Sequence, residues 1–323
     1  MGSYILRRLL HAIPILFGVM VITFILFYGI QSPRVMAKRI LGDKAKEEAV
    51  QNWLHQRGYD KPVFINLKGG NPFDSQFFRH VGALATFNLG TSDATGEPVI
   101  ERFKQGALPS LSVTLPAFFM GIVIAVCAAL YFVHVRDTAA DLAGTIGSVV
   151  LMSLPIMVWV ICGHALFAVW LRYVPAFGFS LAPGDAVRFL ALPVCLLVFA
   201  GLGSDVRLYR AIFLEESRGE YVRTARAKGL SNQAVLLRHV LKNGMISIIT
   251  LTVAALPALI MGTLVIEDFF GIPGLGSLAL DAIRSSDFSV IRATTYVGSV
   301  LYLIGLILTD ICYALVDPRI KLR

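Results

Sequence analysis

A short basic segment between two long apolar runs carries the side chains best suited to specific chemistry. It reads EYVRTARAKG and consists of Glu220, Tyr221, Val222, Arg223, Thr224, Ala225, Arg226, Ala227, Lys228 and Gly229. Arginine offers a planar fork of N–H donors that pairs with a carboxylate or a phosphate through two parallel hydrogen bonds. The small side chains beside these cations would let the groove of a partner approach closely. The segment therefore suits docking on another protein, and a basic amphipathic helix lying on anionic lipid is the alternative.

The elements that must hold this segment read as a helix, a glycine turn and a second helix. Residues 210–228 favour helix, with acidic side chains early and basic side chains late, an order that complements the helix dipole. Gly229 suits the left-handed position that ends a helix, and Leu230 is the apolar residue expected after it. Ser231 is a good N-cap for a second helix over 232–242.

The composition of the chain indicates an integral membrane protein. Of the 323 residues, 56% are hydrophobic and 15% are charged, and the mean hydropathy is +0.71. A soluble domain has roughly 25% charged residues. The net charge of +8 does not indicate nucleic-acid binding, because the basic residues flank apolar runs. The four cysteines lie inside apolar runs without a CxxC pair, which predicts small buried side chains rather than disulfides or a metal site.

Six apolar runs approach or exceed the roughly 20 residues that a spanning helix needs. They cover residues 9–30, 108–133, 142–171, 189–204, 245–266 and 293–316. The first run is too long for the apolar part of a signal peptide, so we expect a retained span. The fourth is short, and its helix is expected to continue past Asp205. Pro116, Pro155, Pro193 and Pro257 predict kinks. The predicted fold is all-α, with one transmembrane domain over residues 1–323.

Lysine and arginine in the short loops predict the orientation of these spans. With the N-terminus inside, the inner segments carry 14 such residues and the short outer loops carry 4. Both termini and the loop 205–243, which contains the basic segment, are therefore expected in the cytoplasm. The loop 31–107 is expected outside, where it would cap the extracytoplasmic mouth or form a tolerated insertion. Residues 44–55 within it are predicted to form a short helix.

Several segments carry a resemblance to a known family. EYVRTARAKGLS, from Glu220 onward, resembles the cytoplasmic loop of bacterial ABC importer permeases in the dipeptide/oligopeptide branch. Further similar segments are YILRRLLHAIPILFGVMVITF at 4–24, GYDKPV at 58–63, FNLGTS with GEPV at 87–99, VIEDFFGIPGLGSL at 265–278 and DICYALVDPRIKL at 310–322. One departure is Gln31-Ser32-Pro33-Arg34, where the branch usually has a Pro-Gly-Asp-Pro-like turn. The similarity covers nearly the whole chain.

The resemblance implies a permease subunit in the bacterial inner membrane. Its 220–229 segment would be the coupling helix, docked in a cleft of an ATPase subunit. Arg223, Arg226 and Lys228 would pair with acidic ATPase groups, the alanine and tyrosine side chains would fill the groove, and Gly229 would permit the bend. A second permease, two ATPase subunits or domains and an extracytoplasmic solute-binding protein are the implied partners. ATP and magnesium would be bound by the ATPases, with no cofactor in this chain.

Two other classes of function were weighed against the importer. An ion-gradient-driven transporter often shows repeats and buried ionisable groups, whereas this chain offers one acid deep in a span, Asp310, and no evident repeat. A membrane-embedded enzyme finds no support, because HExxH, GxSxG and GxxxxGK[ST] are all absent from the sequence. The cargo stays open among peptides, glutathione, nickel chelates and peptide-like antibiotics, and the residues that line the pathway are not identified.

Overall fold

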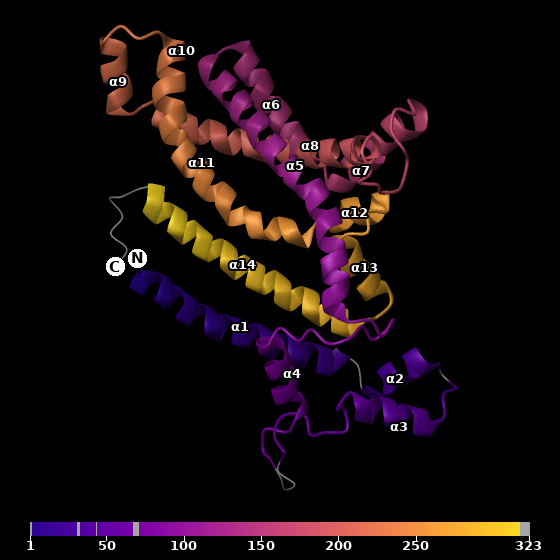
Figure 1. The fold of residues 1–323 in the computed structure, drawn as a ribbon. Coiled ribbons are helices and arrows are strands. Elements are labelled where there is room, and N and C mark those ends of the chain that lie inside the picture. Colours follow the sequence, from indigo (N-terminus) through magenta and orange to yellow (C-terminus); the bar gives the residue numbers. More distant parts are fainter. Residues whose placement is uncertain (1, 31–32, 43, 67–70, 317–323) are drawn as a thin grey trace. The chain divides into compact units, whose positions relative to one another are not determined.

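The computed structural model describes residues 2–30, 33–42, 44–66 and 71–316 (Figure 1). Within these ranges the secondary structure is helical, apart from an isolated antiparallel bridge between Thr91 and Pro98. The predicted all-α class is therefore confirmed for the described chain. Residues 31–32 of the departing turn, and the basic residues Arg319, Lys321 and Arg323, lie outside the described ranges.

The chain forms two compact units. Of the described residues, the first unit holds those within 2–105 and 278–304, and the second holds 106–277 and 305–316. The first unit contains α1 (Gly2–Ile30), α2 (Pro33–Leu41), α3 (Glu47–Gln56), α4 (Gln76–Ala85) and most of α14 (Phe288–Val316). Its small core joins α2 to α3 through Ala37, Val50, Trp53 and Leu54. The predicted helix over 44–55 corresponds to α3, whereas α2 and α4 were not predicted.

The second unit is the larger helical body. Its first members are most of α5 (Val99–His134), α6 (Ala139–Ser153), α7 (Ile156–His164), the π-helical turn η1 (Ala165–Trp170) and α8 (Asp185–Glu216). Then follow α9 (Glu220–Ala227), α10 (Asn232–Val235), the π-helical turn η2 (Leu236–Val240), α11 (Leu241–Ala255), the 3₁₀ turn η3 (Leu256–Met261) and α12 (Leu264–Phe270). Helix α13 (Leu275–Arg284) begins in this unit and ends in the first.

Four helical stretches in the described chain are long and apolar enough to cross a membrane. They are Val99–His134, Asp185–Glu216, Asn232–Met261 and Phe288–Cys312. The stretch Leu10–Leu26 within α1 is apolar but shorter. Many large apolar side chains on these helices are exposed, as are Cys127, Cys162 and Cys195, so the expectation that the cysteines are buried is wrong for these three. Exposed apolar helix surfaces are what a lipid solvent requires.

The predicted run 142–171 is a bent pair of helices rather than one straight span. Helices α6 and α7–η1 meet at 93° around Pro155. Proline lacks the N–H that a helix needs and clashes with the preceding turn, so it is the physical cause of the break. Pro116 and Pro193 instead lie inside the continuous helices α5 and α8. The kink predicted from composition is therefore strongest at Pro155.

One predicted boundary shifts in the structure, and the expected extension of another helix is confirmed. Helix α5 begins at Val99, so the loop predicted to end at residue 107 is shorter, and residues 99–107 are helical. Helix α8 continues without a break past Asp205 to Glu216, as predicted from the shortness of the fourth apolar run. Helices α5 and α8 thus extend beyond their apolar runs, because polar residues that favour helix continue each helix past its last apolar residue.

Candidate functional site

The basic segment 220–229 forms its own short helix, α9, between α8 and α10 (Figure 1). The prediction of one helix over 210–228 is wrong, because α8 ends at Glu216 and α9 begins at Glu220. At the break, the Ser217 hydroxyl donates to the Leu214 carbonyl at 2.7 Å, and Gly219 adopts an extended conformation. Serine and glycine both offer the backbone alternatives to helix, which explains the interruption.

One face of α9 packs into the core of the second unit. Val222 is 1% exposed and Ala225 is 4% exposed, and both belong to a cluster that includes Phe213, Val235 and Val240. The predicted small-residue docking surface is therefore wrong for Val222 and Ala225, whereas Ala227 is exposed. This burial anchors α9 firmly, since each apolar side chain removed from water stabilises the fold by about 1 to 3 kcal/mol.

Tyr221 is also engaged within the chain. Its hydroxyl donates to the Glu216 carboxylate and lies 3.1 Å from the Glu216 carbonyl oxygen. Partial burial raises the pKa of Tyr221, and the neighbouring Glu216 raises it further. The tyrosine therefore stays protonated and ties α9 back to the end of α8, which differs from the predicted role of filling the groove of a partner.

The outward face of α9 presents the polar side chains. Exposed members of the segment are Glu220, Arg223, Thr224, Arg226, Ala227, Lys228 and Gly229. Arg223 Nη1 lies 2.9 Å from Glu220 Oε1, and Arg226 Nη2 lies 3.4 Å from Asn232 Oδ1. Because the Arg223–Glu220 pair is open to solvent, it contributes at most about 1 kcal/mol. The Arg223 and Arg226 guanidinium groups can therefore leave Glu220 and Asn232 for a stronger acceptor at a small cost in free energy.

The end of α9 follows the predicted glycine pattern. Gly229 has φ +82°, its N–H donates to the Arg226 carbonyl at 2.9 Å, and the Leu230 N–H donates to the Ala225 carbonyl at 3.3 Å. These two bonds define a Schellman ending. The Ser231 hydroxyl then accepts from the Ala234 N–H at 3.3 Å, which confirms the predicted N-cap. The second predicted helix, 232–242, continues without a stop into α11.

A cavity of about 460 Å³ beside α9 gathers more arginines than the segment itself contains. Arg136 and Arg218 join Arg223 and Arg226 in its lining, and no acidic residue lines it. Among the described residues, the Arg218 guanidinium has no hydrogen-bond or ion-pair partner. In the sequence, Arg136 and Arg218 are two of the 14 inner basic residues that predict orientation, and nothing else distinguishes them. Their proximity to α9 arises from packing, since Arg136 is about ninety residues away along the chain.

Arg210, on α8, has a different environment from Arg218, which follows the end of that helix. Its Nε lies 2.9 Å from Asp141 Oδ1 and its Nη2 lies 2.7 Å from Asp141 Oδ2, a bidentate pair with a carboxylate that is largely buried. This pair fastens α6 to α8. Arg210 is thus committed within the chain, whereas Arg218 is available.

A second polar centre organises the GIPGLG turn. The Glu267 carboxylate, which is 0% exposed, accepts hydrogen bonds from the Ser110 hydroxyl and from the N–H groups of Thr263, Gly276 and Ser277, at 2.8 to 3.1 Å. A side chain at Gly274 would meet the same carboxylate. This glycine-rich stretch therefore wraps a buried acid, a role that its sequence did not reveal.

The span-length apolar helices of the described chain define an integral membrane protein, and the short basic helix α9 lies between two of them. Comparison with known proteins identifies the family. A family described as binding-protein-dependent transport system inner membrane component matches residues 117–322, and the N-terminal part of binding-protein-dependent transport system membrane components matches residues 1–114. The chain therefore belongs to the binding-protein-dependent transport system inner membrane components, as the sequence resemblance predicted.

Named relatives align along their whole length. A protein of Brucella abortus (strain 2308), named for a peptide transport system permease, is 30% identical and covers 99% of both chains. The dipeptide transport system permease of Alkalihalophilus pseudofirmus is 27% identical, over 99% of this chain and 100% of its own. The glutathione transport system permease of Salmonella paratyphi A is 29% identical over 100% of both chains.

Proposed function

We propose that this chain is one of two permease subunits of an ATP-driven importer for di- or oligopeptides or peptide-like solutes. Its family supplies the inner membrane component of binding-protein-dependent transport systems. Relatives named for peptide and dipeptide transport support a peptide cargo, and a relative named for glutathione supports a peptide-like one. A non-peptide cargo such as a nickel chelate is the alternative within the family.

The proposed permease domain covers residues 1–323 and crosses the membrane six times. The six crossings would be α1, α5, the bent pair α6 with α7–η1, α8, the run from α10 to η3, and α14. The charge bias of 14 to 4 supports cytoplasmic termini and a cytoplasmic α9. Such a chain would form half of the translocation pathway, with the second half supplied by a similar permease.

The segment from Glu220 to Gly229 would couple this domain to an ATPase subunit. The observation that carries this proposal is the cavity beside α9, where four arginines meet without a lining acid. Arg223 and Arg136 have only exposed ion pairs, with Glu220 and Asp137, so the cavity keeps an excess of positive charge that an acidic partner would balance. Because Val222 and Ala225 are buried in the core, movement of α9 would be transmitted directly to α8 and α10. Arg226, Lys228 and Ala227 lie on the exposed side that would face the partner.

ATP hydrolysis would belong to the partners. The sequence has no GxxxxGK[ST] motif, so ATP and magnesium would be bound by two ATPase subunits or domains. An extracytoplasmic solute-binding protein would deliver the cargo, in keeping with the family description. Family membership favours this arrangement over an ion-gradient-driven transporter, for which copurification with ATPase subunits would not be expected.

The decisive experiment reverses one charge on α9. In the complex reconstituted with its ATPases and binding protein, Arg226→Glu is expected to lower solute-stimulated ATP hydrolysis at least about 10-fold, the effect of roughly 1.4 kcal/mol or more of lost contact energy. Membrane insertion of the variant should be unchanged, since Arg226 is exposed. Undiminished hydrolysis and transport in a correctly inserted variant would contradict the assignment.

Arg238→Glu serves as the matched control. Arg238 is exposed on η2, carries the same charge and does not line the cavity. Its ATPase activity is expected to stay within about twofold of the parent, as for surface charges away from a contact. Equal losses in both variants would indicate a general charge effect, such as binding to anionic lipid, rather than docking on a protein.

A further inference from the structure

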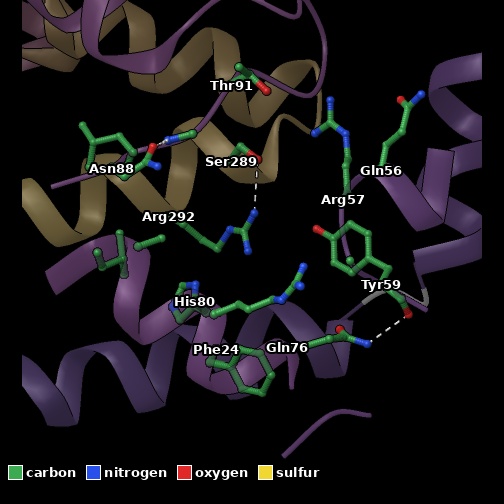
Figure 2. Close-up of a pocket in the computed structure, with 17 residues that line it drawn as sticks. Phe24, Gln56, Arg57, Tyr59, Gln76, His80, Asn88, Thr91, Ser289 and Arg292 are labelled. Atoms are coloured by element: carbon green, nitrogen blue, oxygen red, sulfur yellow. Dashed lines mark hydrogen bonds between the residues drawn. The ribbon is translucent and has the colours of Figure 1, made fainter. Parts of the chain in front are cut away.

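The first unit contains a cavity of about 450 Å³ that the proposed coupling role does not use (Figure 2). Its walls come from α1, the end of α3, α4, the segment 88–91 and the start of α14. This volume falls within the range of small-molecule sites, about 300 to 1,000 Å³. All the lining residues belong to the first unit, so the cavity is complete within it.

Three arginines line this cavity, and two of them have an acidic partner within the chain. Arg57 donates to the buried Asp93 carboxylate. Arg79 Nε lies 3.0 Å from Asp74 Oδ1. Arg292 differs, because the partners of its guanidinium are the Phe288 carbonyl at 3.3 Å and the Ser289 hydroxyl at 3.1 Å, both uncharged. Arg292 is therefore the lining arginine without an acidic partner among the described residues, whereas Arg79 shares the Asp74 carboxylate with Lys61.

Arg292 reaches from α14 toward the centre of the cavity, with His80 close by (Figure 2). Two of its five N–H donors are used by the bonds to Phe288 and Ser289, which leaves three for a ligand. The side chain is half-buried, so a ligand there would meet a partly desolvated cation. An ion pair in such a place is stronger than one in open water.

His80 also lines this cavity, through its ring rather than through its enclosed Nε2 atom. Its Nε2 is buried and has no hydrogen-bond partner among the described residues. Burial lowers the pKa of His80 to about 4, and the nearby Arg292 charge lowers it further, against a hydrogen bond to the Met20 backbone. The imidazole is therefore neutral near pH 7 and adds no second cation.

The remaining polar lining is neutral. Gln56, Tyr59, Asn88 and Thr91 contribute amide and hydroxyl groups around the cavity (Figure 2). The Gln76 amide is already used, since its Nε2 donates to the carbonyls of Tyr59 and Lys61 at 3.0 and 2.7 Å. Neutral donors and acceptors around a single cation recognise a small monoanion that also carries polar groups.

We infer that this cavity binds the carboxylate of a small solute, with Arg292 as the anchoring cation. A carboxylate carries the single negative charge that one uncompensated guanidinium balances, and it matches the planar fork of arginine. A phosphate near pH 7 carries more than one charge, which this lining would leave partly unbalanced. The C-terminal carboxylate of a short peptide is the form that the proposed function would supply, and this choice of source rests on that function.

The test measures binding directly, without ATP or transport. The full-length chain in nanodiscs is titrated with alanyl-alanine, with its C-terminal amide and with inorganic phosphate. The free dipeptide is expected to bind at least about 10-fold more tightly than the amide, which lacks the charge. Arg292→Gln should remove this preference, and Arg292→Lys, which keeps the charge but loses the fork, should retain part of it.

Arg34→Gln is the matched control, because Arg34 lies in the same unit, is exposed beside Glu47 and does not line the cavity. Its binding preference should equal that of the parent, and size-exclusion profiles should show all variants intact. Equal binding of dipeptide and amide, unchanged preference in an intact Arg292→Gln chain, or binding of phosphate alone would each overturn the inference. Normal binding with no transport by the reconstituted complex would contradict the proposed function and leave this site standing.

Discussion

Two groups of arginines in this protein have opposite surroundings. In the first unit, Arg57 contacts Asp93 and Arg102 lies 3.9 Å from Asp287, and both aspartates are buried. In the second unit, Arg218 and Arg226 line the cavity beside α9 without a lining acid. The arginines of the first group each meet a buried carboxylate, and we call this set the closed network. Arg218 and Arg226 have no acidic partner in the described part of the chain and form the open group.

The closed network is built from reciprocal hydrogen bonds between two segments far apart in sequence. Asp287 accepts from the Ser92 hydroxyl and, at 2.9 Å, from the Asp93 N–H. Asp93 in turn accepts from the Ser289 N–H at 2.9 Å, at the start of α14. Buried charges that are fully bonded are costly to disturb, whereas exposed cations cost little to keep. The comparison teaches that an arginine serves the fold where packing brings it to a buried carboxylate, and remains available for a partner where no carboxylate is near.

The sharpest test of the comparison removes a carboxylate from the closed network. Asp287→Ala should destabilise the protein by about 3 to 5 kcal/mol, because the Asp93 N–H and the Ser92 hydroxyl lose their acceptor and Arg102 loses its counter-charge. Denaturant titration in detergent measures this. Asp281→Ala, at an exposed acid in the same unit, should change stability by less than about 0.5 kcal/mol. A loss below 1 kcal/mol for Asp287→Ala would break the comparison.

The next largest effect is expected at Arg210, the paired arginine of the second unit. Arg210→Gln should cost about 2 to 3 kcal/mol, since it leaves the Asp141 carboxylate without its bidentate partner. The free energy of unfolding, measured in the same detergent, gives the value. If Arg210→Gln left the free energy of unfolding unchanged, location in the second unit, and not pairing with a carboxylate, would decide the cost of replacing an arginine.

His80 provides a pH test in the first unit. Its folded pKa of about 4 lies below the ordinary 6.5, so the unfolded chain binds more protons between these values. The stability that comes from a neutral His80 is therefore present above pH 6.5 and is lost as pH falls toward 4. At pH 5 the loss is about 2 kcal/mol. Unfolding of the parent and of His80→Gln at pH 7 and pH 5 would reveal it, and an identical pH dependence in both would contradict this account.

Substitution of Gly229 tests the left-handed turn that ends α9, the helix that carries Arg226 of the open group. Gly229→Ala should cost about 1 kcal/mol, because its φ of +82° disfavours a side chain although space is open around it. Thermal unfolding checks the value. Gly147→Ala, in ordinary helical geometry with open space, should be neutral or slightly stabilising. Equal costs at both glycines would mean that the left-handed turn is not what matters.

The smallest effect on stability is expected at Arg218. Arg218→Gln should change the free energy of unfolding by less than about 0.5 kcal/mol, because no group in the described chain depends on its charge. The Arg218→Gln variant should nevertheless copurify less well with ATPase subunits than the parent does. Arg210 lies on α8 and Arg218 just after the end of that helix, so the contrast between them separates paired from unpaired cations. A destabilisation at Arg218 comparable to that at Arg210 would remove the distinction.

Local features of the site were predictable from sequence, and assembled features were not. The turn at Gly229 and the cap at Ser231 depend on a few adjacent residues, and both appear as predicted. The break between α8 and α9 was missed, because helix-forming residues surround Ser217 and Gly219. Arg136 was counted only for orientation, because nothing in its own neighbourhood along the chain connects it to α9.

The sequence by itself determined the helical membrane class, the family and the location of the basic segment. These follow from hydrophobic periodicity, composition and short motifs, which act over a few turns of chain. Tertiary structure alone decided that Val222 and Ala225 face the core, that Glu267 is enclosed by the glycine-rich turn, and which arginines find a carboxylate. The physical reason is that burial and charge pairing depend on segments far apart in the chain, whose meeting is set by packing and not by local propensity.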